Sequence, residues 1–128
     1  MPIVIEVNAP EPVYEQIVRQ IHTGVNAGRL APGTALPTVR QLAGDLSINR
    51  NTVARAYKML EDQGVIQTAG RKGTFVRPDA SKQVARLKST DAHRAMRRVI
   101  ERLMGDGLRR DEITEVFKQA LRPDNNKG

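Results

Sequence analysis

A run of polar side chains in the middle of the chain has the residue types that recognise nucleic acid. Arg50, Asn51 and Thr52 are consecutive, and Arg55 and Lys58 follow at helical spacing. Arginine can donate two hydrogen bonds to guanine and asparagine can pair with adenine, whereas further cations suit the phosphate backbone. The pattern therefore predicts a helix whose polar face contacts DNA, with Arg50 to Thr52 nearest the base edges.

Two further groups of candidate residues lie on either side of this helix. Downstream, Gly70 and Gly73 enclose Arg71 and Lys72, a combination that lets the backbone approach a phosphate and supplies positive charge. Upstream, Arg40 is either a DNA contact or a structural ion-pair partner of a nearby carboxylate. The predicted DNA-binding residues are Arg40, Arg50, Asn51, Thr52, Arg55, Lys58, Gly70, Arg71, Lys72 and Gly73.

Capping residues define the two helices that position these side chains. Thr38 and Gln41 have the spacing of a capping box, so a helix is expected to begin at Thr38. Residues 47–49 break its apolar period, and Asn49 is a good N-cap for a second helix. Gly64 suits the left-handed residue that ends that second helix. A helix, a tight turn and another helix are therefore expected from residue 38 to residue 63.

The segment after Gly64 predicts a β-hairpin. Residues 65–68 and 74–76 are two β-prone runs, and residues 69–73 between them contain two glycines and two cations. A hairpin directly after two such helices is the layout of a winged helix-turn-helix. The predicted fold class is mainly α with a small β-hairpin, followed by a short all-α dimerisation region.

Four motifs in this stretch carry a family resemblance. They are L-P-T-V-R-Q-L-A, I-N-R-N-T-V-A-R-A-Y, L-E-D-Q-G-V-I and G-R-K-G-T-F-V, in that order. The stretch resembles the DNA-binding domain of the GntR family of bacterial transcription regulators. The resemblance implies DNA-contacting positions on both helices and in the wing. It also shows one departure: many members have an arginine where this chain has Ala54, and Arg55, about 100° further round the helix, is assigned to phosphate.

The residues before the motifs predict a strand and a first helix. Alternation of apolar residues at 3–7 is typical of a short strand. Pro12 suits the first turn of a helix that Gly28 would close. Its apolar stripe is expected to pack against the two later helices, and the residues expected to meet are Tyr14, Ile17, Ile21 and Val25 with Leu42, Leu46, Val53 and Tyr57.

The residues after the hairpin predict two amphipathic helices, separated by Gly105-Asp106-Gly107. Their apolar stripes are too extensive to cover each other, so a second copy of the chain is expected. A tail of two helices also resembles the YtrA-like subfamily. The predicted dimerisation residues are Val84, Leu87, Met96, Val99, Ile100, Leu103, Ile113, Val116, Phe117 and Leu121. The predicted domains are 1–78 for DNA binding, 79–122 for dimerisation and 123–128 as a disordered tail.

Charge supports an anionic partner and narrows where it binds. The net charge is +7, and residues 38–77 contain seven Lys or Arg against three Asp or Glu. Residues 1–37 contain two cations against three acids, so the basic excess begins with the predicted DNA-binding helices. Residues 78–128 are also basic, but there a solvated surface is the preferred interpretation.

Several other classes of protein do not fit. The chain has no cysteine, and His22 and His93 are isolated, so no metal site and no cofactor is expected. No catalytic triad or carboxylate pair is visible, so the chain is not expected to be an enzyme. We expect a cytoplasmic location, since neither a secretion signal nor a membrane span is visible. The sequence identifies no small-molecule effector.

These observations predict a sequence-specific DNA-binding regulator, most simply a repressor. A homodimer would present two recognition helices related by symmetry, so its operator would be an inverted repeat in double-stranded DNA. Two alternatives remain open at this point. One is a winged-helix adaptor that binds protein, and the other is a DNA binder without sequence preference.

Overall fold

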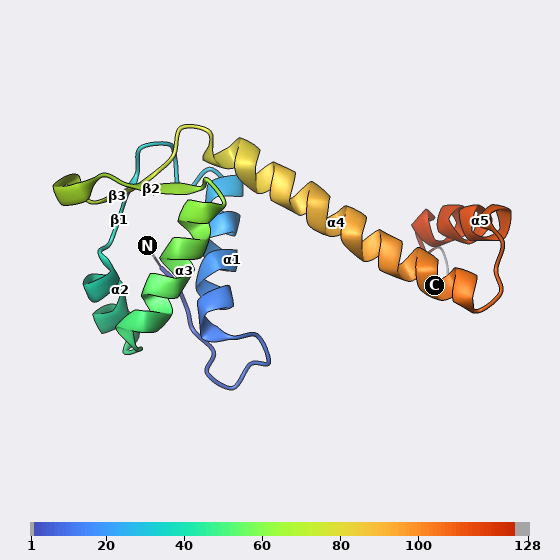
Figure 1. Ribbon diagram of the computed structural model, residues 1–128, viewed down its shortest axis with the longest axis horizontal. Helices are drawn as coiled ribbons and strands as arrows, with labels where there is room; N and C mark the ends of the chain where they lie inside the picture. The colour runs from blue at the N-terminus through green and yellow to red at the C-terminus, as the bar shows by residue number, and fades with distance from the viewer. Residues whose placement is uncertain (1, 125–128) are drawn as a thin grey trace. The chain divides into compact units, whose positions relative to one another are not determined.

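The computed structural model describes residues 2–124, which divide into two compact units after Leu87. The first unit contains helices α1 (Val13–Asn26), α2 (Val39–Leu46) and α3 (Arg50–Asp62) with a small sheet. The second contains most of α4 (Ala80–Gly105) and all of α5 (Arg110–Leu121). Figure 1 follows the chain through these elements. The predicted fold class is confirmed: mainly helical, with a winged helix-turn-helix followed by C-terminal helices.

The predicted helix boundaries in the helix-turn-helix are confirmed by hydrogen bonds. The Thr38 hydroxyl accepts a hydrogen bond from the backbone N–H of Gln41 at 3.0 Å. In return, the side-chain oxygen of Gln41 accepts one from the backbone N–H of Thr38 at 2.9 Å. The capping box therefore forms. Asn49 caps α3 by accepting from the backbone N–H of Asn51 at 2.7 Å. Ser47, with a φ of 55°, makes the tight turn between the two helices.

The sheet has three strands, one more than the predicted hairpin. Strands β2 (Ile66–Thr68) and β3 (Thr74–Val76) form the hairpin, and β1 (Ala35–Leu36) pairs with the other edge of β3. All pairs are antiparallel, with Ala35 opposite Phe75. The segment between α1 and α2 therefore contains a strand that ties the entry of α2 to the wing.

The strand predicted at residues 3–7 does not form. The segment is extended, but it pairs with side chains of α1 instead of another strand. The Gln16 amide group bonds to both the N–H and the C=O of Glu6, each at 2.9 Å. The Gln20 amide does the same for Val4, at 3.0 and 2.7 Å. The alternating pattern predicted an extended backbone, but the hydrogen-bonding partner of this segment is helix α1 and not a strand.

The predicted contact between the helices is confirmed. One continuous core contains the stripe of α1 together with apolar residues of α2 and α3, and α1 and α3 lie side by side (Figure 1). Tyr14 and Leu46 are partly buried against this core. Its members from the predicted stripes are Ile17, Ile21, Val25, Leu42, Val53 and Tyr57.

Both predicted C-terminal helices form, and the first compact unit extends beyond the predicted boundary at residue 78, to Leu87. Ala80 and Val84, in the first turns of α4, are each 1% exposed and belong to the core of the first unit. Leu87 is partly buried against the same core. Val84 is therefore not available to a partner chain, and the amphipathic part of α4 begins after Leu87. The predicted tail lies, from residue 125 on, outside the described residues.

Candidate nucleic-acid interface

The first turn of α3 presents the side chains predicted to read DNA. Arg50 and Asn51 are exposed and Thr52 is half-buried, while Val53 behind them is completely buried. Within residues 2–124 no carboxylate pairs with Arg50, and the side-chain amide of Asn51 forms no hydrogen bond there. The helix therefore presents donors and acceptors that internal contacts leave available.

Arg40 lies on the exposed side of α2, near its N-terminus. The alternative for this residue was an ion pair with Asp45 or Glu61. Neither carboxylate pairs with it in the described chain, and Glu61 instead accepts a hydrogen bond from the Thr68 hydroxyl at 2.6 Å. Arg40 is thus a further cation that is not neutralised within the first unit.

Arg55 and Lys58 continue the exposed side of α3, and each has an internal partner. The Lys58 ammonium lies 3.6 Å from the Asp62 carboxylate, an exposed pair of small energetic value. The Arg55 guanidinium lies over the ring of Tyr14, with Cζ 3.8 Å from the ring centroid. The sequence assigned Tyr14 to the core stripe of α1 and provided no signal for this contact, because the two residues are on different helices.

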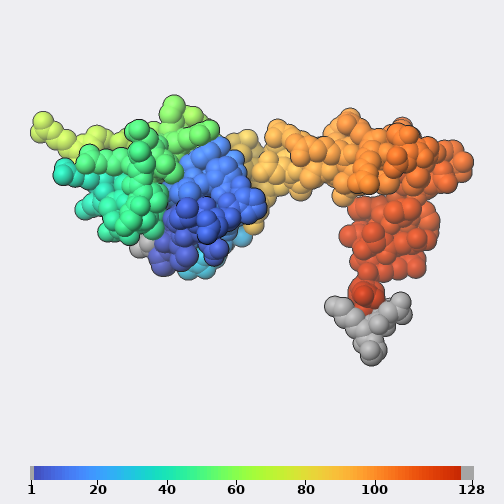
Figure 2. Space-filling model, turned by 90° about the horizontal axis from the view of Figure 1, so that it is seen from below, coloured from blue at the N-terminus to red at the C-terminus, as the bar shows by residue number. Residues whose placement is uncertain are grey.

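The wing projects its cations on a single helical turn. Residues Gly70–Lys72 form a 3-10 turn at the tip, and Arg71 and Lys72 are exposed on it. Figure 2 shows this segment, in yellow-green, as a narrow projection from the first unit. Gly73 has a φ of 100°, a conformation that favours glycine, and its carbonyl accepts from the Ala69 N–H at 2.8 Å.

Two contacts fix this surface to the core. The Tyr57 hydroxyl of α3 donates to the Pro37 carbonyl just before α2, at 2.7 Å, and Tyr57 is 4% exposed. Burial raises the pKa of the Tyr57 phenol, so the hydroxyl stays protonated and able to donate. In the wing, the Thr68 hydroxyl donates to the Glu61 carboxylate of α3 at 2.6 Å and lies 3.2 Å from the Thr74 hydroxyl across the hairpin.

The second unit has a large exposed apolar surface. Ile100, Leu103 and Ile113 are half-buried. The other predicted dimerisation residues that follow Leu87 are exposed by 43% or more, namely Met96, Val99, Val116, Phe117 and Leu121. We call these residues, with Met104, the apolar face: Met96, Val99, Met104, Val116, Phe117 and Leu121.

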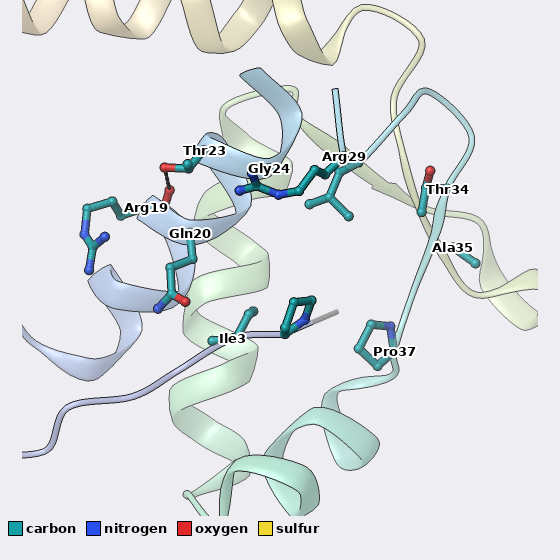
Figure 3. A pocket seen from close by; sticks show the side chains of 11 residues that line it. Ile3, Arg19, Gln20, Thr23, Gly24, Arg29, Thr34, Ala35 and Pro37 are labelled. Atoms are coloured by element: carbon teal, nitrogen blue, oxygen red, sulfur yellow. Dashed lines mark hydrogen bonds between the residues drawn. The ribbon is translucent and has the colours of Figure 1, made fainter. Parts of the chain in front are cut away.

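A cavity of about 530 Å³ also lies in the first unit. Figure 3 shows it between the N-terminal segment, α1 and the segment leading into α2. Arg19 on its wall pairs with Glu11 at 3.0 Å, and the Gln20 amide pairs with Val4. None of the predicted DNA-binding residues lines it. The cavity is therefore separate from the polar surface of α3.

No cluster of three or more potential metal-ligating residues occurs in the described part of the chain. No helix among these residues is long and apolar enough to cross a membrane. The chemistry of the exposed polar surface is hydrogen bonding and charge, which suits recognition of an anion.

Comparison with known proteins agrees with this chemistry. The family model for bacterial regulatory proteins of the gntR family matches residues 13–76. An HTH-type transcriptional regulator of Mycobacterium tuberculosis is 51% identical over 72 residues, which cover 56% of this chain and 60% of that protein's length. The HTH-type transcriptional repressor YtrA of Bacillus subtilis is 32% identical over 115 residues, 90% of this chain and 88% of YtrA.

Solved structures extend the similarity to the whole architecture. A transcriptional regulator from Oenococcus oeni superposes with a TM-score of 0.73 and 33% identity, covering 93% of this chain and 98% of that one. The DNA-binding domain of AraR, solved in complex with operator ORX1, has a TM-score of 0.52 and 25% identity. It covers 59% of this chain and 95% of the AraR chain.

Proposed function

This chain belongs to the GntR family of bacterial transcription regulators, and from that premise we propose that it binds an inverted-repeat operator as a homodimeric repressor. It is an HTH-type transcriptional regulator, not an enzyme. The observation that carries the proposal is the first turn of α3, where the side chains of Arg50 and Asn51 are exposed and have no hydrogen-bond or ion-pair partner among residues 2–124.

In this proposal the residues of the first unit divide into base readers and phosphate contacts. Arg50, Asn51 and Thr52 enter the major groove, where the Arg50 guanidinium donates to a guanine. Arg40, Arg55 and Lys58 hold the backbone beside the groove, and Gly70 to Gly73 bring the wing cations to a neighbouring phosphate or into the minor groove. The AraR complex supports this use of the fold, since that relative was solved with an operator.

The apolar face supports the homodimer. Six large apolar side chains are exposed on α4 and α5, where a monomer leaves them in water. Covering this surface with an identical one gives a closed two-fold dimer. The matching repressor YtrA from Bacillus subtilis covers nearly the same length, so repression is the proposed sense of regulation.

The decisive experiment is selection of duplexes from a random pool by the purified protein at physiological salt, with scrambled duplexes as competitors. We expect enrichment of an inverted repeat and a dimer mass by light scattering at micromolar concentration. Binding of every duplex alike would indicate a DNA binder without sequence preference. A folded protein that binds no duplex would indicate a winged-helix adaptor for protein partners.

A further inference from the structure

The contact between Arg55 and Tyr14 joins the polar side of α3 to α1. The guanidinium lies over the aromatic ring, with Cζ 3.8 Å from the centroid. Tyr14 is itself held, since its ring packs partly buried against the core and its hydroxyl donates to the Glu15 carboxylate at 3.1 Å. A long side chain is therefore fixed over a surface that belongs to the rigid part of the first unit.

Arg55 also lies on the face of α3 that we propose meets DNA. It is one turn after Asn51, about 40° round the helix and about 6 Å along it, so the two side chains share one exposed face. Lys58, the next cation on that face, pairs with Asp62. Ala54 places no charge on this turn, which leaves Arg55 as the cation in this part of α3 that no carboxylate of the described chain neutralises.

Stacking constrains the guanidinium without using its hydrogen-bonding capacity. A guanidinium whose Cζ lies 3.8 Å above a ring centroid is close enough to stack its flat face on the ring, and in such a stack its five N–H donors lie in the plane and point outward. A planar fork held in this way can give two parallel N–H bonds to phosphate oxygens. Less side-chain freedom is lost on binding than for an arginine that is free in solution.

We propose that Tyr14 is a positioning residue of the DNA interface: its ring holds the Arg55 guanidinium in place to receive a backbone phosphate. The proposal rests on the proposed DNA binding, but not on sequence preference, because a phosphate contact is the same on any duplex. Tyr14 itself touches no DNA and acts through Arg55.

The first test asks whether the stack exists in the wild-type protein in solution. An aromatic ring shifts the resonances of protons above its face upfield, so we expect the side-chain protons of Arg55 to be shifted in an NMR spectrum of the free protein. Adding duplex should perturb the Arg55 Nε resonance while the upfield shift persists. Unshifted Arg55 protons, or an Nε resonance that ignores DNA, would overturn the proposal.

The second test is a double-mutant cycle on one fixed duplex at low salt, using Tyr14→Leu, Arg55→Ala and both together. Removal of this charge-assisted contact predicts that Arg55→Ala weakens binding about 10- to 100-fold. Tyr14→Leu should weaken it about 3- to 5-fold, and the double variant should bind no worse than Arg55→Ala. Effects that multiply would mean that Tyr14 and Arg55 act independently, which would reject the positioning role.

Three controls separate positioning from general damage. Tyr14→Phe retains the ring but loses the hydroxyl, so it should bind within about twofold of wild type. Arg29→Ala removes an exposed arginine of the first unit outside α3 and measures the effect of charge alone. Thermal melts show whether Tyr14→Leu is folded, and the wild-type NMR experiment decides the question if it is not.

The outcomes also separate this proposal from the function it rests on. A protein that binds duplexes without selecting an operator would contradict sequence-specific regulation but leave the cycle readable. A protein that selects an operator but shows no coupling between the two residues would contradict only the role of Tyr14.

Discussion

The two units differ in how far they bury their apolar side chains, and α4 contributes residues to both units. Val84, near the start of α4, is 1% exposed, whereas Val99 on the same helix is 52% exposed. In the first unit three helices, a sheet and the start of α4 enclose one core. The second unit has only two helices to enclose its apolar residues. The contrast indicates that the first unit encloses its apolar core within one chain. We assign the covering of the exposed apolar residues in the second unit to a partner chain.

The largest expected effect is loss of the core of the first unit. Leu60→Ala removes a completely buried side chain of α3 and should lower the free energy of unfolding by about 2–5 kcal/mol. Urea denaturation followed by circular dichroism measures this change. Leu121→Ala, at a residue that is 67% exposed, is the matched control in the second unit. If both variants of a monomeric protein lost the same free energy of unfolding, the two units would not differ in how they bury apolar residues.

The next effect concerns association. Val99→Asp combined with Phe117→Asp places two charges in the apolar face, and a charge that dimerisation would bury without a partner is strongly unfavourable. We expect the dimer to dissociate at micromolar concentration in analytical ultracentrifugation, with the helices of the first unit intact. Val7→Asp, at an exposed valine in the first unit, should leave the mass unchanged. A dimer that survives both charges would place the interface elsewhere.

Base reading should depend on the first unit alone. Arg50→Ala is expected to cost about 1–3 kcal/mol of binding to the selected operator and to relax preference at one symmetric base position. Arg98→Ala removes an exposed cation from the second unit and should leave the sequence preference unchanged. Titration of matched and single-base-changed duplexes makes the comparison. If Arg50→Ala weakened all duplexes equally, Arg50 would be a phosphate contact.

The wing should contribute charge without sequence preference. Lys72→Ala removes an exposed cation at the tip, and the log–log dependence of affinity on salt should become shallower by about 0.9 for each phosphate that the wing no longer neutralises. Fluorescence anisotropy across a salt series measures the slope. A slope identical to that of wild type would show that Lys72 binds no phosphate.

The smallest effect lies at the start of α4, within the first unit. The Asp79 carboxylate accepts from Gln83 at 3.1 Å and from Arg77 at 3.2 Å, and these bonds lower its pKa. A carboxyl group whose pKa is lowered by folding stabilises the folded state at any pH above the pKa of an ordinary aspartate. That stabilisation is lost as the pH falls through the pKa of the group in the folded protein. Asp79→Asn should therefore melt slightly below wild type at pH 7, and the difference should vanish near pH 2. A difference that persists in acid would assign it to packing.

Local signals in the sequence predicted most of the fold of the first unit. The capping box at Thr38, the N-cap at Asn49 and the glycine after α3 each act over a few residues, so they need no knowledge of the tertiary structure. The polar surface of α3 followed from the same local pattern, since the helical period places its exposed residues opposite Val53 and Leu60.

The features that sequence did not predict depend on distant partners. Strand β1 has only two residues, too few to show alternation, and exists through its pairing with Thr74 and Phe75 of β3. The helical period places Val84 on an apolar stripe but does not say which core covers it. The same holds for Arg55: the period gives its face of α3, but its stacking on Tyr14 depends on how α1 packs.

The N-terminal segment has a consequence for where this DNA-binding unit begins. The recognisable family motif starts at residue 13, yet Gln16 on α1 is 2% exposed and its amide is satisfied by the backbone of Glu6 and Glu11. A fragment cut at the motif boundary would lose these hydrogen bonds and the core residue Ile3. We therefore expect a fragment that begins at residue 13 to be less stable than one that includes the N-terminal segment.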